Sequence, residues 1–253
     1  MMYTLYLDRD SFLHKLDPRV KIIGSFLGII AFILFNSPSL LFVLFLTIIL
    51  ALVLIGKIHI REIFTVLKPL IPIAIVAMVI WPFILKPWYF GLFIGAGYGI
   101  RLLSVALLTL GLIMTTSQKD LVLGFIRMGM PYEIGLTLTI ALRYIPTLYM
   151  LTQTIMDAQK SRGLELEKGN FFQRARNTVP VLIPLIVASI KTAHELSIAL
   201  ESRAFGASKR RTFLYDIKME MKDYMSFGVL IALFLLTLYV RYCLEIGLSL
   251  IHI

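Results

Sequence analysis

Long uncharged, mostly apolar runs alternate with charged segments along the 253-residue chain. The first run covers residues 22–56 and contains a turn signal, Asn36-Ser37-Pro38, so it predicts two short helices that form a hairpin. Three further runs cover residues 69–85, 87–118 and 224–240. Because a helix that crosses a bilayer needs about 20 mostly apolar residues, the pattern predicts about five transmembrane helices.

The segment between the fourth and the fifth predicted span, residues 119–223, holds 15 of the 25 basic residues and 10 of the 15 acidic residues. Two series within it keep the i+3 and i+4 spacing of one helix face, from Ile145 to Arg162 and from Leu185 to Arg203. The uncharged stretch at 178–190 is shorter than a span, so it predicts an amphipathic helix at the membrane surface, with a sixth span as the alternative.

The predicted fold is therefore an all-α integral membrane protein with about five transmembrane helices and additional cytoplasmic amphipathic helices. We divide the chain into an N-terminal region of four spans at 1–118, a cytoplasmic helical region at 119–223 and a C-terminal transmembrane helix at 224–253.

Basic residues flank these runs unevenly. They precede the first span, lie between the second and third, and follow the fourth: Lys15, Arg19, Lys21, Lys57, Arg61, Lys68, Lys119 and Arg127. The turn near Asn36 has no basic residue, and the loop at 86–90 has only Lys86. Because short cytoplasmic loops carry the excess of lysine and arginine, we expect the N-terminus and the 119–223 segment in the cytoplasm and the C-terminus outside.

The composition agrees with a membrane protein, since 58% of the residues are hydrophobic, the mean hydropathy is +0.86 and only 16% are charged. A net charge of +10 would suggest nucleic acid as the partner of a soluble protein. Here the positive-inside bias explains it, so we expect the lipid bilayer and no nucleic acid as a partner. A single cysteine, Cys243, excludes a disulfide framework within one chain. No signal peptide is expected, because the first run lacks a small-residue cleavage site.

Two arginines end the two helical series in similar local sequences. Residues 158–163 read AQKSRG and residues 199–204 read ALESRA, so both follow the pattern A-x-x-S-R-small. Small neighbours let an arginine at a helix end enter a narrow groove of another protein, where the guanidinium pairs with a carboxylate in a geometry that lysine cannot reproduce. The alternative is that both are ordinary helix C-termini, where a basic residue complements the dipole and Gly163 or Gly206 ends the helix.

Five groups of residues, spread over most of the chain, carry a resemblance to a known family. They are Leu16-Asp17-Pro18-Arg19-Val20-Lys21, Thr115-Thr116-Ser117 with Asp120-Leu121, Ala141-Leu142-Arg143-Tyr144-Ile145-Pro146, Ala158 through Gly163, and Glu201 through Gly206. In this order they resemble the transmembrane T component of energy-coupling factor (ECF) transporters, the family that includes the CbiQ-type cobalt-transport permeases.

The resemblance implies a scaffold without catalytic activity. In that family, Ala-Arg-Gly or Ala-Arg-Ser-like tripeptides end two cytoplasmic coupling helices, and their arginines dock into grooves on two ATPase subunits. The matching tripeptides here are Ser161-Arg162-Gly163 and Ser202-Arg203-Ala204, with serine in place of the first alanine in both and Ala204 in place of glycine or serine. The implied partners are two ABC-type ATPase subunits and a membrane-embedded S component, which binds a vitamin or a transition-metal ion. The implied location is the prokaryotic cell membrane.

Glycines spaced four residues apart predict close helix packing in the membrane, since a missing side chain lets another helix approach. They are Gly24, Gly28, Gly91, Gly95 and Gly99. Arg101 lies well inside the fourth run, where a charge costs on the order of 3 kcal/mol unless it is paired or faces water. It is either a functional residue or one that snorkels or pairs with backbone carbonyls.

The sequence disfavours other kinds of site. His194-Glu195 begins like a zinc-protease motif, but Ile198 stands in place of the second histidine, so we expect no metal site and no cofactor. No phosphate-binding G-x-x-x-x-G-K-[ST] loop occurs, so any ATP use belongs to a partner. The alternative function is a self-sufficient channel or secondary transporter, which would favour inverted repeats and polar residues at the membrane midplane. An intramembrane enzyme is less favoured, because the uncharged runs contain no acid or histidine.

Overall fold

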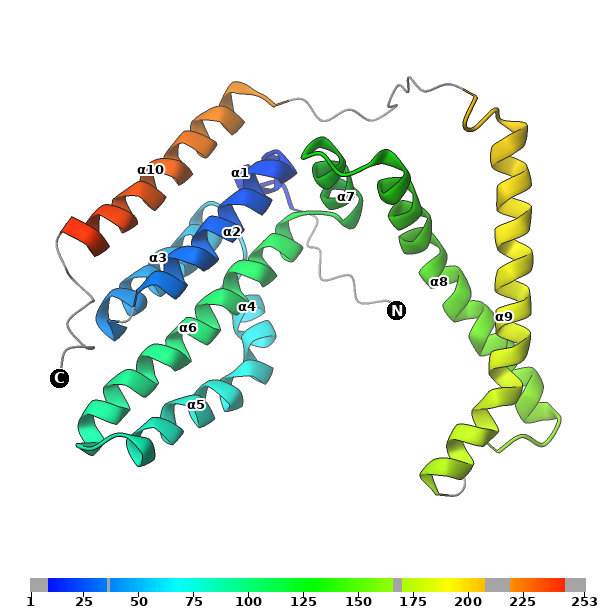
Figure 1. Cartoon of the computed structure of the whole chain (residues 1–253), viewed down its shortest axis with the longest axis horizontal. Helices are drawn as coiled ribbons and strands as arrows, with labels where there is room; N and C mark the ends of the chain where they lie inside the picture. The colour runs from blue at the N-terminus through cyan, green and yellow to red at the C-terminus, as the bar shows by residue number, and fades with distance from the viewer. Residues whose placement is uncertain (1–8, 36, 166–169, 208–218, 244–253) are drawn as a thin grey trace. The chain divides into compact units, whose positions relative to one another are not determined.

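The computed structural model describes residues 9–35, 37–165, 170–207 and 219–243, which form helices and connections and no strands (Figure 1). The chain divides into two compact units. The first unit comprises Tyr3–Gly135 and Ile217–Ile253, and the second comprises Leu136–Asp216. The all-α class predicted from the sequence is confirmed.

The first unit opens with a short helix, α1 (Phe12–Lys15), and with the predicted hairpin of α2 (Pro18–Leu34) and α3 (Pro38–Leu54). Both long helices begin with proline, whose fixed φ suits the first helical position and whose missing N–H would have no partner there. Asp17 caps α2, and its side chain accepts a hydrogen bond from the Arg19 amide at 2.8 Å. α2 ends at Leu34 and α3 begins at Pro38, so the predicted division of this run into two helices is confirmed.

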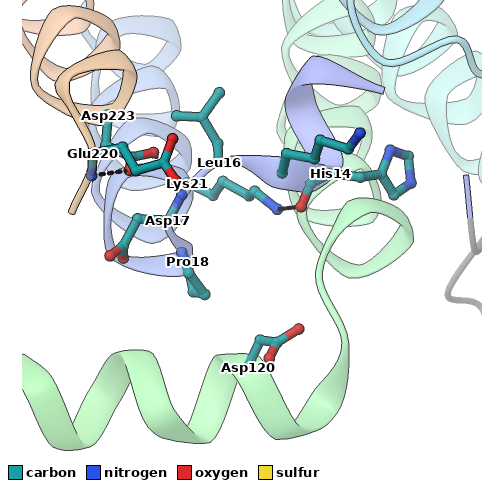
Figure 2. Close-up of a pocket in the computed structure, with 9 residues that line it drawn as sticks. His14, Leu16, Asp17, Pro18, Lys21, Asp120, Glu220 and Asp223 are labelled. Carbon is teal, nitrogen blue, oxygen red and sulfur yellow. Dashed lines mark hydrogen bonds between the residues drawn. The ribbon is translucent and has the colours of Figure 1, made fainter. Parts of the chain in front are cut away.

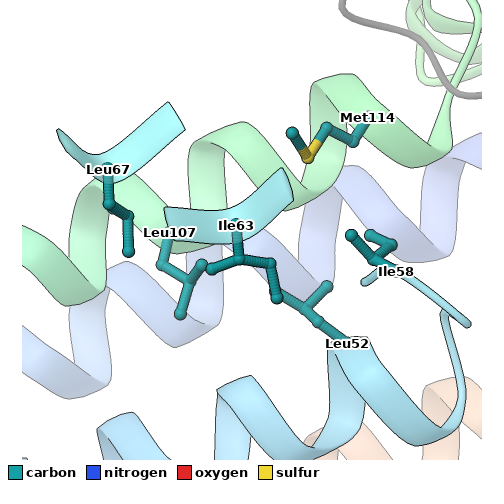
Figure 3. Close-up of a cluster of buried hydrophobic side chains, with 6 residues drawn as sticks. All are labelled: Leu52, Ile58, Ile63, Leu67, Leu107 and Met114. Carbon is teal, nitrogen blue, oxygen red and sulfur yellow. The ribbon is translucent and has the colours of Figure 1, made fainter. Parts of the chain in front are cut away.

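A continuous helical path follows, made of α4 (Ile60–Leu67), a 3₁₀ turn η1 (Lys68–Leu70) and α5 (Ile71–Ile84). The next helix, α6 (Trp88–Thr115), runs back beside α5 (Figure 1). The main apolar core lies where α3, α4 and α6 meet (Figure 3). Its buried side chains are Leu52, Ile58, Ile63, Leu67, Leu107 and Met114.

Two more helices complete the first unit. After Ser117, whose hydroxyl accepts a hydrogen bond from the Asp120 amide, α7 (Gln118–Arg127) turns away from α6 and packs on α2. The last helix, α10 (Met221–Cys243), also packs on α2. The helix that precedes the second unit, α7, and the helix that follows it, α10, therefore both pack on α2.

The second unit contains most of α8 (Tyr132–Ser161) and all of α9 (Phe171–Ser202). Both are long unbroken helices despite Pro146, Pro180 and Pro184. Apart from Gly135, which belongs to the first unit, the residue buried in these two helices is Val181.

Five helices are long and apolar enough to cross a membrane, judged by length and composition over the described residues: Ile60–Ile84, Trp88–Thr115, Tyr132–Ser161, Phe171–Ser202 and Met221–Arg241. The prediction of about five such helices is confirmed in number, but the membership differs. The prediction included α2 and α3, which have only 17 residues each, and placed α8 and α9 at the membrane surface or in the cytoplasm. The helix predicted at 178–190 was limited to the uncharged stretch, whereas α9 continues through the charged residues on both sides of it.

Candidate coupling site

The two arginines singled out from the sequence stand at equivalent helix ends. After α8, the Leu164 amide donates to the Gln159 carbonyl at 3.0 Å, and the Gly163 amide donates to the Lys160 carbonyl at 2.9 Å. This pair of bonds is a Schellman motif, which makes Arg162 the C-cap residue and Gly163 the left-handed residue beyond it, with φ of 87°.

The end of α9 repeats this geometry with a different residue. The Phe205 amide donates to the Leu200 carbonyl at 3.0 Å, and the Ala204 amide donates to the Glu201 carbonyl at 2.9 Å. Ala204 takes the left-handed conformation with φ of 56°, so Arg203 is the C-cap residue. The expectation that Gly206 ends this helix is wrong, because the terminating hydrogen bonds close two residues earlier, at Ala204.

The serines before both arginines also behave alike. The Ser161 hydroxyl donates to the Asp157 carbonyl at 3.0 Å, and the Ser202 hydroxyl donates to the Ile198 carbonyl at 2.8 Å. Each serine hydroxyl is therefore hydrogen-bonded within its own helix, and the neighbouring guanidinium stays available to a partner. Arg162 and Arg203 are exposed and make no ion pair with any described residue of the chain.

A cluster of charged residues at the start of α2, which the sequence did not single out as a site, brings together two of the stretches that carried the family resemblance. Lys21 donates from Nζ to the Thr115 carbonyl at 2.9 Å. It also donates to the His14 carbonyl at 3.1 Å (Figure 2). Asp223, on the first turn of α10, accepts from the Asp17 amide at 2.8 Å with Oδ1 and from the Glu220 amide at 2.8 Å with Oδ2. We call Asp17, Lys21 and Asp223, with these backbone partners, the α2 anchor.

The α2 anchor borders a polar pocket of about 200 Å³ (Figure 2). Asp17 and Asp223 are buried, and Lys21 lies on the first turn of α2, before the uncharged run that begins at Ile22. Burial lowers the pKa of the Lys21 ammonium from 10.5 to about 8, an effect that the carboxylates of Asp120, Asp17 and Asp223 oppose. The Lys21 ammonium is thus held close to three carboxylates.

Arg101 pairs with backbone carbonyls. Its Nε donates to the Phe32 carbonyl at 3.0 Å, its other guanidinium end donates to the Phe35 carbonyl, and the guanidinium lies 5.1 Å from the centroid of the Tyr98 ring. Arg241 of α10 donates to the Leu34 carbonyl beside them. The last carbonyls of a helix have no partner within it, so the two arginines satisfy the C-terminal end of α2. This observation favours the structural alternative for Arg101.

The predicted packing glycines lie at helix contacts of two kinds. A Cβ at Gly91 would lie 2.6 Å from the Pro82 Cα, and one at Gly95 would overlap the Met78 carbonyl oxygen, so α5 and α6 touch through their backbones. A Cβ at Gly99 would lie 3.2 Å from the Ala74 oxygen.

The remaining two glycines meet flexible side chains instead. A Cβ at Gly24 would lie 2.8 Å from Cδ1 of Leu230, and one at Gly28 would lie 2.9 Å from Cδ1 of Leu108. The leucine ends can move, so these two positions constrain the packing less than Gly91 and Gly95 do.

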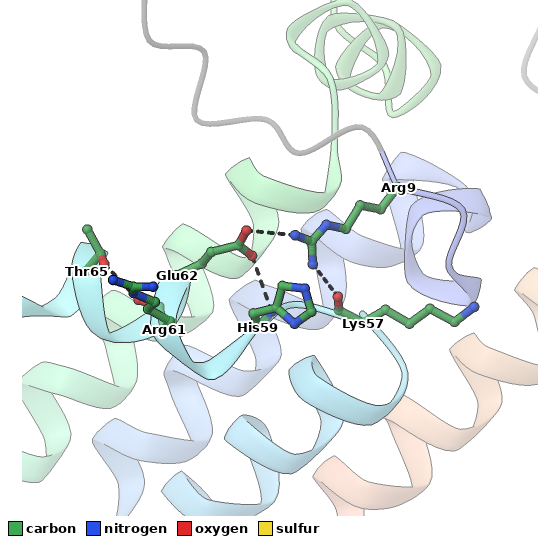
Figure 4. Close-up of polar contacts among 6 residues, drawn as sticks. All are labelled: Arg9, Lys57, His59, Arg61, Glu62 and Thr65. Carbon is green, nitrogen blue, oxygen red and sulfur yellow. Dashed lines mark hydrogen bonds and ion pairs between the residues drawn. The ribbon is translucent and has the colours of Figure 1, made fainter.

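A second polar contact that the sequence did not predict ties the N-terminal segment to α4. Arg9 donates to the Glu62 carboxylate at 2.7 Å and to the Lys57 carbonyl at 2.6 Å, and Glu62 also accepts from the His59 amide at 3.3 Å (Figure 4). The Glu62 carboxylate therefore caps the start of α4 and at the same time binds the Arg9 guanidinium. Across the described residues, no group of three or more His, Cys, Asp or Glu side chains could hold a metal ion.

Comparison with known proteins agrees with the resemblance. Residues 9–214 match the CbiQ family model, described as cobalt transport protein. The chain belongs to this family. It is 35% identical to the energy-coupling factor transporter transmembrane protein EcfT of Clostridium kluyveri, over 87% of this chain and 89% of that protein. It is 33% identical to EcfT of Acidaminococcus fermentans, over 94% and 95%, and 29% identical to EcfT of Staphylococcus aureus, over 94% and 96%. The chain is thus a multi-pass transmembrane component of a prokaryotic ECF transporter.

Proposed function

We propose that this chain couples two ABC-type ATPase subunits to a membrane-embedded S component, and that Arg162 and Arg203 are the residues that hold the ATPases. The observation that carries the proposal is the pair of equivalent helix ends. Each presents an exposed arginine at the C-cap, with the neighbouring backbone and serine hydroxyl already hydrogen-bonded.

Two equivalent arginines suit two related partner subunits. A guanidinium binds a carboxylate through two parallel hydrogen bonds, and such a contact gains most in a groove that excludes water. The small residues that follow, Gly163 and Ala204, keep each helix end slim enough to enter such a groove. Hydrolysis of ATP belongs to the partners, so the chain itself is not an enzyme.

The mechanism is mechanical. With 30 and 32 residues, α8 and α9 are about 45 Å and about 48 Å long at 1.5 Å per residue. Once its end is held by a partner, a long helix moves as a rigid body rather than deforming. When the ATPases close on ATP, the two arginine sockets move, α8 and α9 shift, and the S component reorients to release a vitamin or a transition-metal ion. In this arrangement the N-terminus and the ATPase-binding helix ends lie on the cytoplasmic side.

The test replaces both arginines with glutamate and measures how much ATPase co-purifies with the detergent-extracted chain. Arg162→Glu with Arg203→Glu should lower ATPase recovery at least tenfold, because a carboxylate would repel the acidic socket. Arg176→Glu, a single charge reversal of the same kind at an exposed residue of α9, is the control and should keep wild-type recovery. Unchanged recovery from the double variant would contradict the role of the two arginines.

A further inference from the structure

The two ends of the segment between α6 and α10 meet at one place in the first unit. The Thr115 carbonyl, two residues before the cap of α7, accepts from Lys21 at 2.9 Å. The Asp223 carboxylate, on the first turn of α10, accepts from the Asp17 amide at 2.8 Å. Asp17 and Lys21 are four residues apart at the start of α2, so a single helix end holds both sides of the segment.

These contacts are buried and mutually supporting. Asp17 is 3% exposed and Asp223 is 5% exposed. Asp223 bridges two backbone amides from segments more than 200 positions apart in the sequence, and hydrogen bonds to charged groups are the stronger kind. Removing one partner would leave a buried charge without compensation, which is costly. Local loosening at this point is therefore disfavoured.

We infer that the α2 anchor is the fixed point through which motion of α8 and α9 is delivered to the transmembrane helices of the first unit. Without a fixed end, a displacement of the second unit would be absorbed by fraying of α7 and of the first turn of α10. With both ends held at α2, the displacement acts on α2 and α10 instead. Asp17, Lys21 and Asp223 are thus positioning residues for coupling. This inference rests on the proposed function.

The test uses the complete complex with its ATPases and S component in lipid nanodiscs. Spin labels at Thr47→Cys in α3 and Ser197→Cys in α9, both exposed, report the distance between the two units in a Cys243→Ser background. Pulsed electron paramagnetic resonance is recorded without nucleotide and with ATP plus vanadate. With the anchor intact, nucleotide should shift the distance distribution.

Lys21→Met and Asp223→Asn should each reduce that shift by at least half or broaden it, while ATPase recovery stays at the wild-type level. Lys21→Arg, which keeps the charge and can donate to both carbonyls, should restore the shift. Lys222→Met and Asp10→Asn, at exposed neighbouring and N-terminal positions, are the matched controls and should leave it unchanged.

A full shift in both anchor variants would overturn the inference. If Arg162→Glu with Arg203→Glu still loses the ATPases in that case, the proposed function stands and the anchor role alone is wrong. Absence of any nucleotide-dependent shift with the anchor intact contradicts both. If the distance shift is reduced in Lys21→Arg as much as in Lys21→Met, the Lys21 charge has no positioning role.

Discussion

The two units of the chain differ in what surrounds their apolar side chains. In the first unit, helices pack on one another around two buried clusters, and the helix ends are closed by Asp17, Arg101 and Arg241. In the second unit, the large apolar side chains of α8 and α9 are exposed or half-buried, and Val181 is the one buried apolar residue among those described. The first unit therefore has an apolar core of its own, whereas the described part of the second unit has almost none.

The largest difference in stability between the two units should appear when one leucine in each is replaced by alanine. Leu107→Ala removes a side chain that is 2% exposed in the core of the first unit, and it should lower the free energy of unfolding by about 2–5 kcal/mol. Leu182→Ala, at 46% exposed on α9, should change it by about 0.5 kcal/mol or less in the isolated chain. Thermal unfolding in detergent measures both. Equal losses would show that the second unit has a core of its own.

A smaller effect is expected when a methyl group is added between two helices. In Gly95→Ala the new carbon would overlap the Met78 backbone, so α5 and α6 must separate at a cost of about 1–3 kcal/mol. Gly228→Ala on α10 is the control, because no atom lies within 4 Å of the added carbon. Its stability should stay unchanged or rise, since alanine favours helix more than glycine does. A stable Gly95→Ala chain would contradict the backbone contact.

The smallest effect compares the two arginine-bearing helix ends within the second unit. A left-handed conformation costs a residue with a Cβ about 1 kcal/mol, so Ala204→Gly should stabilise the end of α9 and Gly163→Ala should destabilise the end of α8 by similar amounts. Hydrogen exchange of the Phe205 and Leu164 amides, which close the two ends, measures the change. Opposite signs are expected. Changes of the same sign would mean that the two ends are not built alike.

The hairpin at the start of the chain and the two arginine-bearing helix ends could be predicted because their signals are local. The turn signal Asn36-Ser37-Pro38 is three residues long, and the pattern around Arg162 and Arg203 repeats within six. The length of α9 could not be predicted in this way. Charges beside an apolar run do not end a helix, so the uncharged stretch at 178–190 marked only the middle of a 32-residue element.

The sequence by itself determined the helical class, the membrane environment, the family and the two exposed arginines, because periodicity, apolar length and short motifs depend on neighbouring residues. Only the tertiary structure decided that Lys21 meets Thr115, that Asp223 meets Asp17, and that Arg101 closes the end of α2. These contacts join residues 69 to 206 positions apart. A buried charge needs a partner, but its own neighbours along the chain do not reveal which distant group supplies it.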